Sequence, residues 1–327
     1  MSTSADKNSY VHKGIDALVA HLDRSRPVVI QAHDFPDHDA VAAGYALRQL
    51  LHVRDIPAEL CYSGRIQSNS LTEAVRMLSI PLHNSSELNL TNQTQIILVD
   101  GFVGNRNVTD LPGVVVALID HHSPPERPTV PYWDIRKDYG STSTIIWSYY
   151  HEAQISVPPA CATSLLMGLM MDTAFMTRGV NKVDLDAFSD LFFQGDWQAG
   201  SRLLKNSLSL ADLAVFREAL NSCQVVGDFC FIPVHCECSP EVAALTADFF
   251  LNLREINFVV VVVRDQNEYR LSVRSDDIKR PADSIIRRAL AGIGFGGGHV
   301  HMGGGQIPLA SFPGEEALRA LFLREIQ

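Results

Sequence analysis

Short β-branched runs alternate with helical patterns through the first half of the chain, and this alternation constrains the fold more than any other feature. The expected strands there are 28–32, 58–62, 95–99 and 114–119. The expected helices are 39–51, 70–78, 143–153, 159–171 and 183–193. Strands that alternate with helices are typical of a parallel sheet covered by helices. We therefore predict an α/β fold for this half.

The pattern changes between residues 195 and 227, where Gly195-Asp196-Trp197 precedes a helical stretch at 208–220. Beyond it, the expected strands are 228–234, 258–264 and 268–274, and the expected helices are 240–253 and 282–291. The residues Asp265-Gln266-Asn267 favour a hairpin turn between the last two strands. The predicted organisation is a parallel-sheet domain at 1–195, a helical linker at 196–227 and a smaller α+β domain at 228–327.

Composition excludes several classes of partner. The chain has 327 residues, 46% of them hydrophobic, which is enough for two ordinary domains. Its formal charge of −10 argues against binding to long duplex nucleic acid, because sequence-independent binding needs a cationic surface. No stretch reaches the roughly 18 apolar residues of a membrane helix, and residues 1–7 lack a signal-peptide core. We expect a soluble, cytoplasmic protein with no membrane partner.

The six cysteines form no CxxC pair, so we expect free thiols in a reducing compartment. The segment His235-Cys236-Glu237-Cys238 contains zinc-type ligands, but its spacing matches no familiar zinc motif. It follows an apolar run, and we predict that it continues as a strand with alternating faces.

Acidic residues and histidines follow three of the expected strands. The first strand leads into the segment 33–39, His-Asp-Phe-Pro-Asp-His-Asp. The strand 95–99 ends at Asp100, and 114–119 ends at Asp120-His121-His122. Ligands of open parallel sheets collect beyond the carboxyl ends of the strands, and carboxylates there are costly to desolvate without compensation. A cation cluster is the natural compensation.

Each of these residues also has an ordinary structural explanation. Asp37 or Asp39 fits the N-cap of the following helix, since aspartate is favoured there. Asp100 before Gly101 fits a turn, and Asp172 fits the end of a helix. The ordered combination is more specific than any single member.

The combination resembles the DHH superfamily of phosphoesterases, in particular members with a DHH-associated C-terminal domain. The N-terminal motifs that carry the resemblance are HDFPDHDA, ILVDG, IDHH and GLMMDT, and the C-terminal ones are LSVRS and FGGGHVHMGGG. It spans about residues 28–308. It implies that 1–195 is the DHH catalytic domain, that 228–327 binds substrate, and that the active site lies in the cleft between them.

The resemblance also implies two divalent metal ions, with manganese first and magnesium or cobalt as alternatives. One ion would be held by His33, Asp37 and Asp100. The other would be held by Asp39, Asp100, His121 and Asp172, so that Asp100 bridges the two. Asp120 would orient the neighbouring His121, and His122 would contact the phosphate or protonate the leaving oxygen.

The second domain would bind the substrate through glycines and a cation. Gly297 and Gly298 would offer backbone N–H groups beside His299, although a glycine cluster is more often simply a loop. Arg274 would grip a terminal phosphate, with help from Ser275. Met302 departs from the smaller residue usual in the family, which puts the shape of the pocket in doubt.

By layout the chain is most similar to the oligoribonuclease (nanoRNase) and pAp-phosphatase group. That similarity implies hydrolysis of short RNA, especially dinucleotides such as pApA or pGpG, to nucleoside 5′-monophosphates. A pAp 3′-phosphatase, a cyclic dinucleotide phosphodiesterase and a non-catalytic nucleotide sensor remain alternatives. The glycine-rich segment argues against an inorganic pyrophosphatase. A homodimer is a possible assembly.

Overall fold

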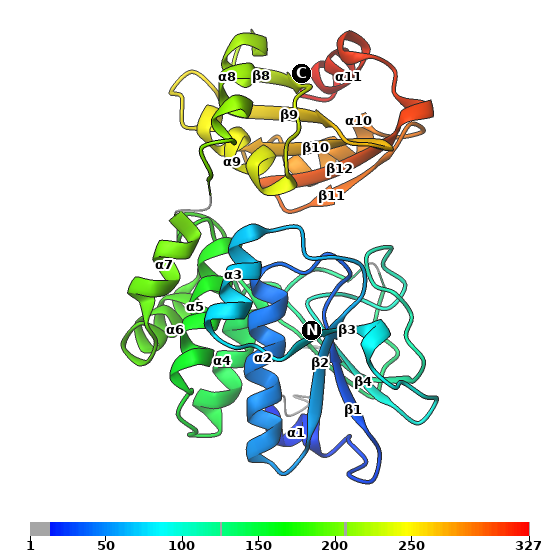
Figure 1. The fold of residues 1–327 in the computed structure, drawn as a ribbon, viewed down its shortest axis with the longest axis vertical. Helices are drawn as coiled ribbons and strands as arrows, with labels where there is room; N and C mark the ends of the chain where they lie inside the picture. Colours follow the sequence, from blue (N-terminus) through cyan, green and yellow to red (C-terminus); the bar gives the residue numbers. More distant parts are fainter. Residues whose placement is uncertain (1–13, 125, 206–207, 327) are drawn as a thin grey trace, which may run out of the picture. The chain divides into compact units, whose positions relative to one another are not determined.

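The computed structural model describes residues 14–124, 126–205 and 208–326. The chain divides into two compact units, 1–206 and 207–327, each with its own sheet (Figure 1). The polar stretch 1–7, which we expected to lack a signal-peptide core, lies outside the described residues. Across the described ranges, no helix combines the length and the apolar character needed to span a bilayer.

The first unit contains the predicted parallel sheet. Its six strands lie in the order β3-β2-β1-β4-β5-β6, and every pairing is parallel. The strands are β1 (Val28–Gln31), β2 (Ala58–Tyr62), β3 (Leu82–Asn84), β4 (Gln95–Val99), β5 (Val114–Asp120) and β6 (Tyr132–Ile135). The order reverses between β1 and β4, so the carboxyl ends of these two strands flank a topological switch point.

The two faces of this sheet are covered differently. The helices of the unit are α1 (Ile15–Val19), α2 (His38–Val53), α3 (Asn69–Met77), α4 (Thr142–Glu152), α5 (Pro159–Asp172), α6 (Lys182–Gln194) and α7 (Trp197–Lys205), with a 3₁₀ turn at Ser85–Glu87. Ile30, Ile97 and Ile119 pack in the core that contains α2, α4 and α5. Ile96 and Leu98, which alternate with them, pack against the loop after β4. The α/β prediction for this half is confirmed.

The second unit is a mixed sheet with helices on both faces. Its strand order is β11-β12-β10-β9-β8-β7, and only β8 and β9 are parallel. The strands are β7 (Gln224–Val226), β8 (Phe229–Val234), β9 (Phe258–Arg264), β10 (Glu268–Ser275), β11 (Phe295–Gly298) and β12 (Met302–Pro308). The helices are α8 (Leu213–Ser222), α9 (Pro240–Leu251), α10 (Ala282–Ala289) and α11 (Glu315–Ile326), with a 3₁₀ turn at Leu309–Ser311.

The uninterrupted apolar run of β9 reflects burial on both sides. Val259 and Val261 pack with α8 and α9, whereas Val260 and Val262 pack with α10 and α11. A strand covered on both faces loses the polar alternation of a half-exposed one. The smaller α+β unit is therefore confirmed.

The boundary between the units falls inside the stretch 196–227 that we predicted as a linker. Helix α7 lies in the predicted helical linker, although no helix was expected at these residues in particular, and it packs into the first unit through Leu204 beside Met167 of α5. The helix expected at 208–220 begins only at Leu213 as α8, which packs in the second unit through Val215.

Two local features of the second unit differ from expectation. The glycine-rich segments were not expected as strands, but β11 and β12 pair antiparallel with Gly296 opposite Gly305 and Gly298 opposite Gly303. A Cβ on Gly296 would lie 2.8 Å from Ile286 Cγ1, so these glycines let α10 pack directly on the strand backbone. The segment 235–238 is not a strand, since β8 ends at Val234 and these residues form the loop before α9.

Candidate metal centre

The loop between β1 and α2 carries His33 and Asp37, which together with Asp100 form the first ligand group. Asp37 is the N-cap of α2, where its Oδ1 accepts hydrogen bonds of 3.0 Å from the backbone of both Asp39 and Ala40. Its other oxygen lies 3.7 Å from His33 Nε2. The capping role and the ligand role are thus compatible, because each uses a different oxygen of one carboxylate.

Asp100 faces two separate groups of histidines. It follows β4 with φ +57°, a left-handed conformation that aspartate adopts more readily than most residues other than glycine. Its Oδ2 lies 3.8 Å from His33 Nε2. Its Oδ1 lies 3.8 Å from His121 Nε2 and 3.5 Å from His122 Nδ1. This is the placement that a bridging carboxylate requires.

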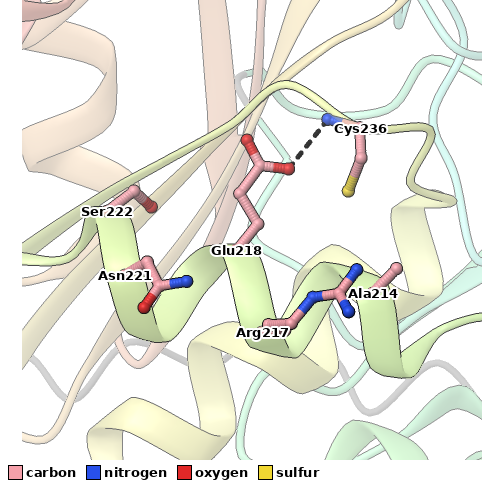
Figure 2. Close-up of a pocket in the computed structure, with 6 residues that line it drawn as sticks. All are labelled: Ala214, Arg217, Glu218, Asn221, Ser222 and Cys236. Atoms are coloured by element: carbon pink, nitrogen blue, oxygen red, sulfur yellow. Dashed lines mark hydrogen bonds between the residues drawn. The ribbon is translucent and has the colours of Figure 1, made fainter.

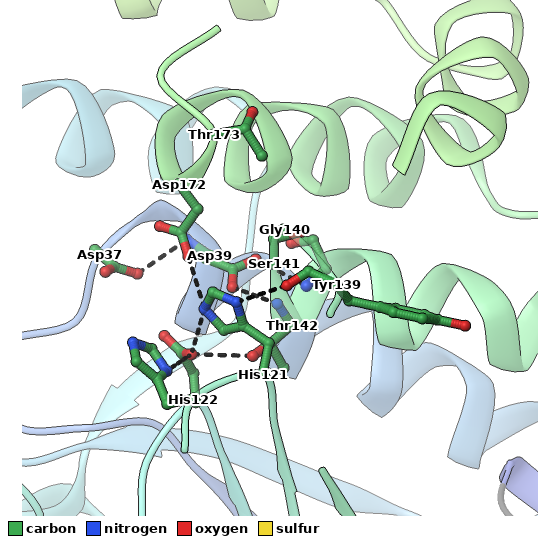
Figure 3. A network of polar contacts seen from close by, with 12 residues as sticks. Asp37, Asp39, His121, His122, Tyr139, Gly140, Ser141, Thr142, Asp172 and Thr173 are labelled. Carbon is green, nitrogen blue, oxygen red and sulfur yellow. Dashed lines mark hydrogen bonds and ion pairs between the residues drawn. The ribbon is translucent and has the colours of Figure 1, made fainter. Parts of the chain in front are cut away.

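Asp39, His121 and Asp172 form a second group, and Figure 3 shows their side chains pointing toward one another. His121 Nε2 lies 3.0 Å from Oδ2 of Asp172, the last residue of α5. Asp39 is completely buried, and its two oxygens accept hydrogen bonds from the backbone N–H groups of Thr142 (2.7 Å) and Ser143 (2.8 Å). The candidate ligand atoms of Asp39, His121 and Asp172 lie within 4.8 Å of one another.

The hydrogen bonding of His121 tests whether this group fits a cation. His121 Nδ1 lies 3.1 Å from the carbonyl oxygen of Tyr139, which can only accept, so Nδ1 carries a proton. The neutral ring then directs the lone pair of Nε2 at Asp172, and two acceptors face each other. A proton or a metal ion between them removes the conflict. Carboxylate and imidazole ligands fit a divalent ion such as manganese.

The pKa values of the groups around this site also favour a bound cation. Burial, together with the charges of Asp172 and Asp100, raises the pKa of Asp39 well above its ordinary range. Burial also raises the pKa of Asp172 to about 6, although its contact with His121 opposes the rise. Burial alone would lower the pKa of His121, but the hydrogen bond and charge of Asp172 raise it to about 9. A bound cation would relieve this crowding of buried acids.

Asp120 orients His122 rather than His121. Its buried Oδ1 accepts hydrogen bonds of 2.8 Å from both the backbone N–H and Nδ1 of His122. The expected support of His121 by Asp120 is therefore wrong, because the Tyr139 carbonyl occupies that position. Burial would lower the pKa of His122, but hydrogen bonds to Asp100 and Asp120 raise it to about 12.

Several contacts around the ligands were not predicted. Ser141 is the N-cap of α4 and accepts a 3.0 Å bond from the Thr144 N–H. Gly168 of α5 allows α2 and α4 to approach, since a Cβ there would lie 2.4 Å from Ser143 Oγ and 3.0 Å from Asp39 Cα. The motif containing Gly168 was recognised, but its packing role was not.

The predicted substrate residues of the second unit divide between the two faces of its sheet. Strand register places Arg274, Ser272, Gly304 and Gly297 on one face. Arg274 donates from Nε to Asp248 Oδ1 at 2.6 Å. A Cβ on Gly304 would meet, among the described residues, only Leu271 O at 4.0 Å, so this part of the face exposes backbone.

The remaining predicted substrate residues lie elsewhere. Ser275 and Gly298 have the opposite register parity from Arg274 and Gly297. Ser275 is fully buried, and its Oγ donates to the carbonyl oxygen of Asp277. His299 follows β11, and its backbone N–H donates to Met302 O at 2.7 Å. Their contact with substrate stays a prediction.

A pocket in the second unit lies beside α8 and is lined by Ala214, Arg217, Glu218, Asn221, Ser222 and Cys236 (Figure 2). Glu218 accepts hydrogen bonds there from the backbone N–H groups of His235 (2.8 Å) and Cys236 (3.0 Å). His235 also contacts Glu218 and Glu315 through its two ring nitrogens. Among the described residues, no potential metal-binding group includes His235, Cys236 or Cys238.

Comparison with known proteins identifies the first unit. The family model described as "DHH family, N-terminal domain" matches residues 27–169, which include both ligand-bearing strand ends and the DHH triplet. Residues 27–169 are a DHH family N-terminal domain. The carboxylate and histidine groups described above lie in this domain, except for Asp172, which follows its matched end by three residues.

Relatives and solved structures extend the similarity beyond the DHH domain. An uncharacterized protein of Methanocaldococcus jannaschii is 28% identical over 305 residues, which cover 91% of this chain and 62% of the relative. A probable manganese-dependent inorganic pyrophosphatase of Lactobacillus gasseri is 25% identical over 191 residues, 56% of this chain and 61% of the relative. The chain thus spans about three fifths of the length of these relatives.

The fold also matches a solved structure. The exopolyphosphatase-related protein of Bacteroides fragilis has a TM-score of 0.78 and 20% identity, with coverage of 95% of this chain and 97% of the other. At this level of identity the likeness shows the fold.

Proposed function

We propose that this protein is a metal-dependent phosphodiesterase that hydrolyses short oligoribonucleotides, especially dinucleotides, to nucleoside 5′-monophosphates. The observation that carries the proposal is the placement of Asp100, whose oxygens face His33 on one side and His121 and His122 on the other. One buried carboxylate between two ligand groups supports a two-cation centre, and the DHH domain supports phosphoester hydrolysis.

The ligand groups assign roles to six side chains. His33, Asp37 and Asp100 would hold one cation, and Asp39, His121 and Asp172, again with Asp100, would hold the other. Manganese is our first choice, with magnesium or cobalt as alternatives. When bound, such a pair of cations acidifies a water molecule and neutralises charge as the phosphate is attacked. The Tyr139 carbonyl keeps His121 Nε2 directed at the ligand group.

His122 would bind the phosphate. Because Asp120 accepts the proton of Nδ1, Nε2 is the nitrogen that a substrate phosphate meets. Hydrogen bonds to Asp100 and Asp120 raise the pKa of His122 far above its ordinary range, which favours the charged ring. Effective proton donors have a pKa near the working pH, so this histidine is better suited to holding phosphate charge than to releasing a proton.

The second unit supports a nucleotide substrate. Its Arg274, Ser272 and exposed Gly304 share one face of the sheet, which combines a cation and a hydroxyl with bare backbone. Glycines in a strand interior often mark the close approach of a ligand. Arg274 would bind the terminal phosphate there, and Gly297, Gly298, His299 and Ser275 remain proposed neighbours of the substrate.

Inorganic pyrophosphate is the second candidate substrate, because the Lactobacillus gasseri relative carries the name of a pyrophosphatase. The alternatives pAp and cyclic dinucleotides require the same cleavage centre with a different leaving group. A non-catalytic nucleotide sensor would bind these ligands without turnover.

A hydrolysis panel with manganese separates these functions. It contains pApA, pGpG, longer RNA, pAp, cyclic dinucleotides and pyrophosphate, with Asp100→Asn as the folded control. We expect fastest turnover of the dinucleotides and a loss of more than about 100-fold in the control, the upper end for residues beyond the ligands themselves. Exclusive cleavage of pyrophosphate, or near-normal turnover by Asp100→Asn, would refute the proposal.

A further inference from the structure

Thr142 contacts carboxylates of both ligand groups. It is the first residue of α4 and is completely buried. Its hydroxyl donates to Asp100 Oδ1 at 3.0 Å, while its backbone N–H donates to Asp39 Oδ2 at 2.7 Å. Figure 3 shows Thr142 at this end of α4, beside His121. One residue thus links the carboxylate between the groups to a ligand of the second group.

The hydroxyl is well placed to set the rotation of the Asp100 carboxylate. The terminal torsion of an aspartate side chain is broad, so its contacts decide where each oxygen points. The Thr142 hydroxyl lies 3.0 Å from Oδ1, whereas His121 Nε2 lies 3.8 Å and His122 Nδ1 3.5 Å from that oxygen. With Oδ1 held in this way, Oδ2 is directed toward His33.

The backbone that carries Thr142 is itself fixed. Asp184 of α6 accepts hydrogen bonds from the Gly140 N–H, at 2.9 Å to Oδ1 and 3.0 Å to Oδ2. Ser141 caps the helix by accepting from the Thr144 N–H. A β-branched side chain has few rotamers, so the position of the helix determines the direction of the Thr142 hydroxyl.

We propose that Thr142 is a positioning residue of the metal centre, which orients Asp100 and Asp39 together so that both cation sites are formed before metal binds. The inference deepens the proposed function and rests on it for the metal. Because Thr142 already holds Asp100 in place, no free energy is needed to reorient this carboxylate when the metal binds. Its loss should therefore weaken metal affinity even in the absence of substrate.

Thr144 provides a matched control on the same helix. It is also fully buried, and its hydroxyl also donates to a buried carboxylate, Oδ1 of Asp184. Among the described residues, Asp184 belongs to none of the potential metal-binding groups. Thr144→Val removes an equivalent hydrogen bond from the helix without touching Asp100.

The test is calorimetric titration of the full chain with Mn²⁺ alone, for Thr142→Val, Thr142→Ser and Thr144→Val, with melting temperatures measured in parallel. We expect Thr142→Val to weaken Mn²⁺ binding by about 10–100-fold, the usual range for groups that orient ligands. Thr142→Ser keeps the hydroxyl and should restore most of the affinity. Thr144→Val should lower the melting temperature while binding Mn²⁺ like the natural chain.

Wild-type affinity in Thr142→Val, or an equal loss in Thr144→Val, would overturn the positioning role. If Thr142→Val does not fold, Thr142→Ala is titrated against Thr142→Ser with the same criteria. The outcome is distinct from failure of the proposed function. A natural chain that binds Mn²⁺ but cleaves no phosphodiester refutes the proposed substrate, while the affinities of the variants still decide the role of Thr142.

Discussion

Asp120 accepts two hydrogen bonds of 2.8 Å from His122, one from the backbone N–H and one from Nδ1. The first fixes the turn after β5, and the second fixes the tautomer and orientation of the ring. Two adjacent histidines of the DHH triplet therefore have separate supports, because the Tyr139 carbonyl accepts from His121. This separation lets His121 face the ligand group while Asp120 orients His122 independently.

Replacing Asp120 should affect catalysis more than metal binding. Asp120→Asn removes a charge that helps to raise the pKa of His122, so that pKa should fall. The variant should lose about 10–100-fold in kcat/KM, as is typical for residues that orient catalytic groups. The alkaline limb of the pH–rate profile should also move to lower pH, because His122 loses its proton earlier. The measurement is kcat/KM against pH beside Mn²⁺ titration, and an unchanged profile with full activity contradicts the role.

Metal affinity should depend on pH through the carboxyl groups of the second ligand group. A raised pKa means that a carboxyl keeps its proton to higher pH and must release it to bind a cation. The pKa of His121 is about 9, so Mn²⁺ binding should already weaken as the pH falls below about 9. Because the pKa of Asp172 is about 6 and that of Asp39 is also raised, binding should weaken more steeply below about 6. Each binding event near that pH should release protons.

Titration at pH 5.5 and 7.5 in buffers with different ionisation enthalpies measures this release. The observed enthalpy should vary with the buffer at both pH values and more strongly at the lower one, because His121 releases a proton at both and Asp172 mainly at the lower. Affinity that stays constant between these two pH values would show that Asp39 and Asp172 do not bind the metal as carboxylates that have lost their protons.

The gathering of acidic residues and histidines at the strand ends was predictable from the sequence, because its signals are local. An apolar strand followed by Asp100, or by Asp120-His121-His122, combines a structural pattern with polar chemistry at one position. The supports of these ligands were not predictable in the same way. The Tyr139 carbonyl and the Thr142 N–H are backbone groups, which every residue type provides, so only the fold decides where they point.

The glycine segments show a second limit of the sequence. Glycine is unfavourable in strand interiors, and β11 and β12 were accordingly not among the expected strands. Close packing of Ile286 against Gly296 and Gly305 outweighs the propensity, since a side chain at either position would clash with α10. Which glycines face a helix and which face outward follows only from the register of β11 and β12.

Alanine substitutions at two neighbouring glycines of β12 should therefore have different effects on stability and on substrate binding. A Cβ on Gly305 would lie 2.7 Å from Leu290 Cδ1, 2.8 Å from Ile286 Cδ1 and 3.1 Å from the backbone oxygen of Phe295, so it is confined on the backbone side as well. Gly305→Ala should destabilise the second unit by about 1–3 kcal/mol through overpacking. Gly304→Ala should change stability little, because its Cβ has space, but it should raise KM for dinucleotides by occupying the exposed backbone face.

Chemical unfolding and steady-state kinetics of the two variants separate these effects. A stable Gly304→Ala protein with unchanged KM for every substrate of the panel would exclude this face from substrate binding.

Gly168 should couple the packing of the helices to metal binding. Alanine normally favours a helix interior over glycine by about 1 kcal/mol. At this position its Cβ would lie 2.4 Å from Ser143 Oγ and 3.0 Å from Asp39 Cα, and backbone atoms cannot move aside as a flexible side chain can. Gly168→Ala should therefore destabilise the first unit by about 1–3 kcal/mol despite its helix propensity. It should also weaken Mn²⁺ binding, because α4 and Asp39 are forced apart.

Gly200 of α7 offers the matched control. It is also a buried helical glycine, but its Cβ would lie 3.2 Å from Cγ of Met167, a flexible side chain. Gly200→Ala should thus keep both stability and Mn²⁺ affinity close to those of the natural chain. Thermal unfolding with and without Mn²⁺ compares the two variants. Equal Mn²⁺-induced stabilisation of Gly168→Ala and the natural chain would show that the close approach of α5 to Asp39 is not needed to form the metal centre.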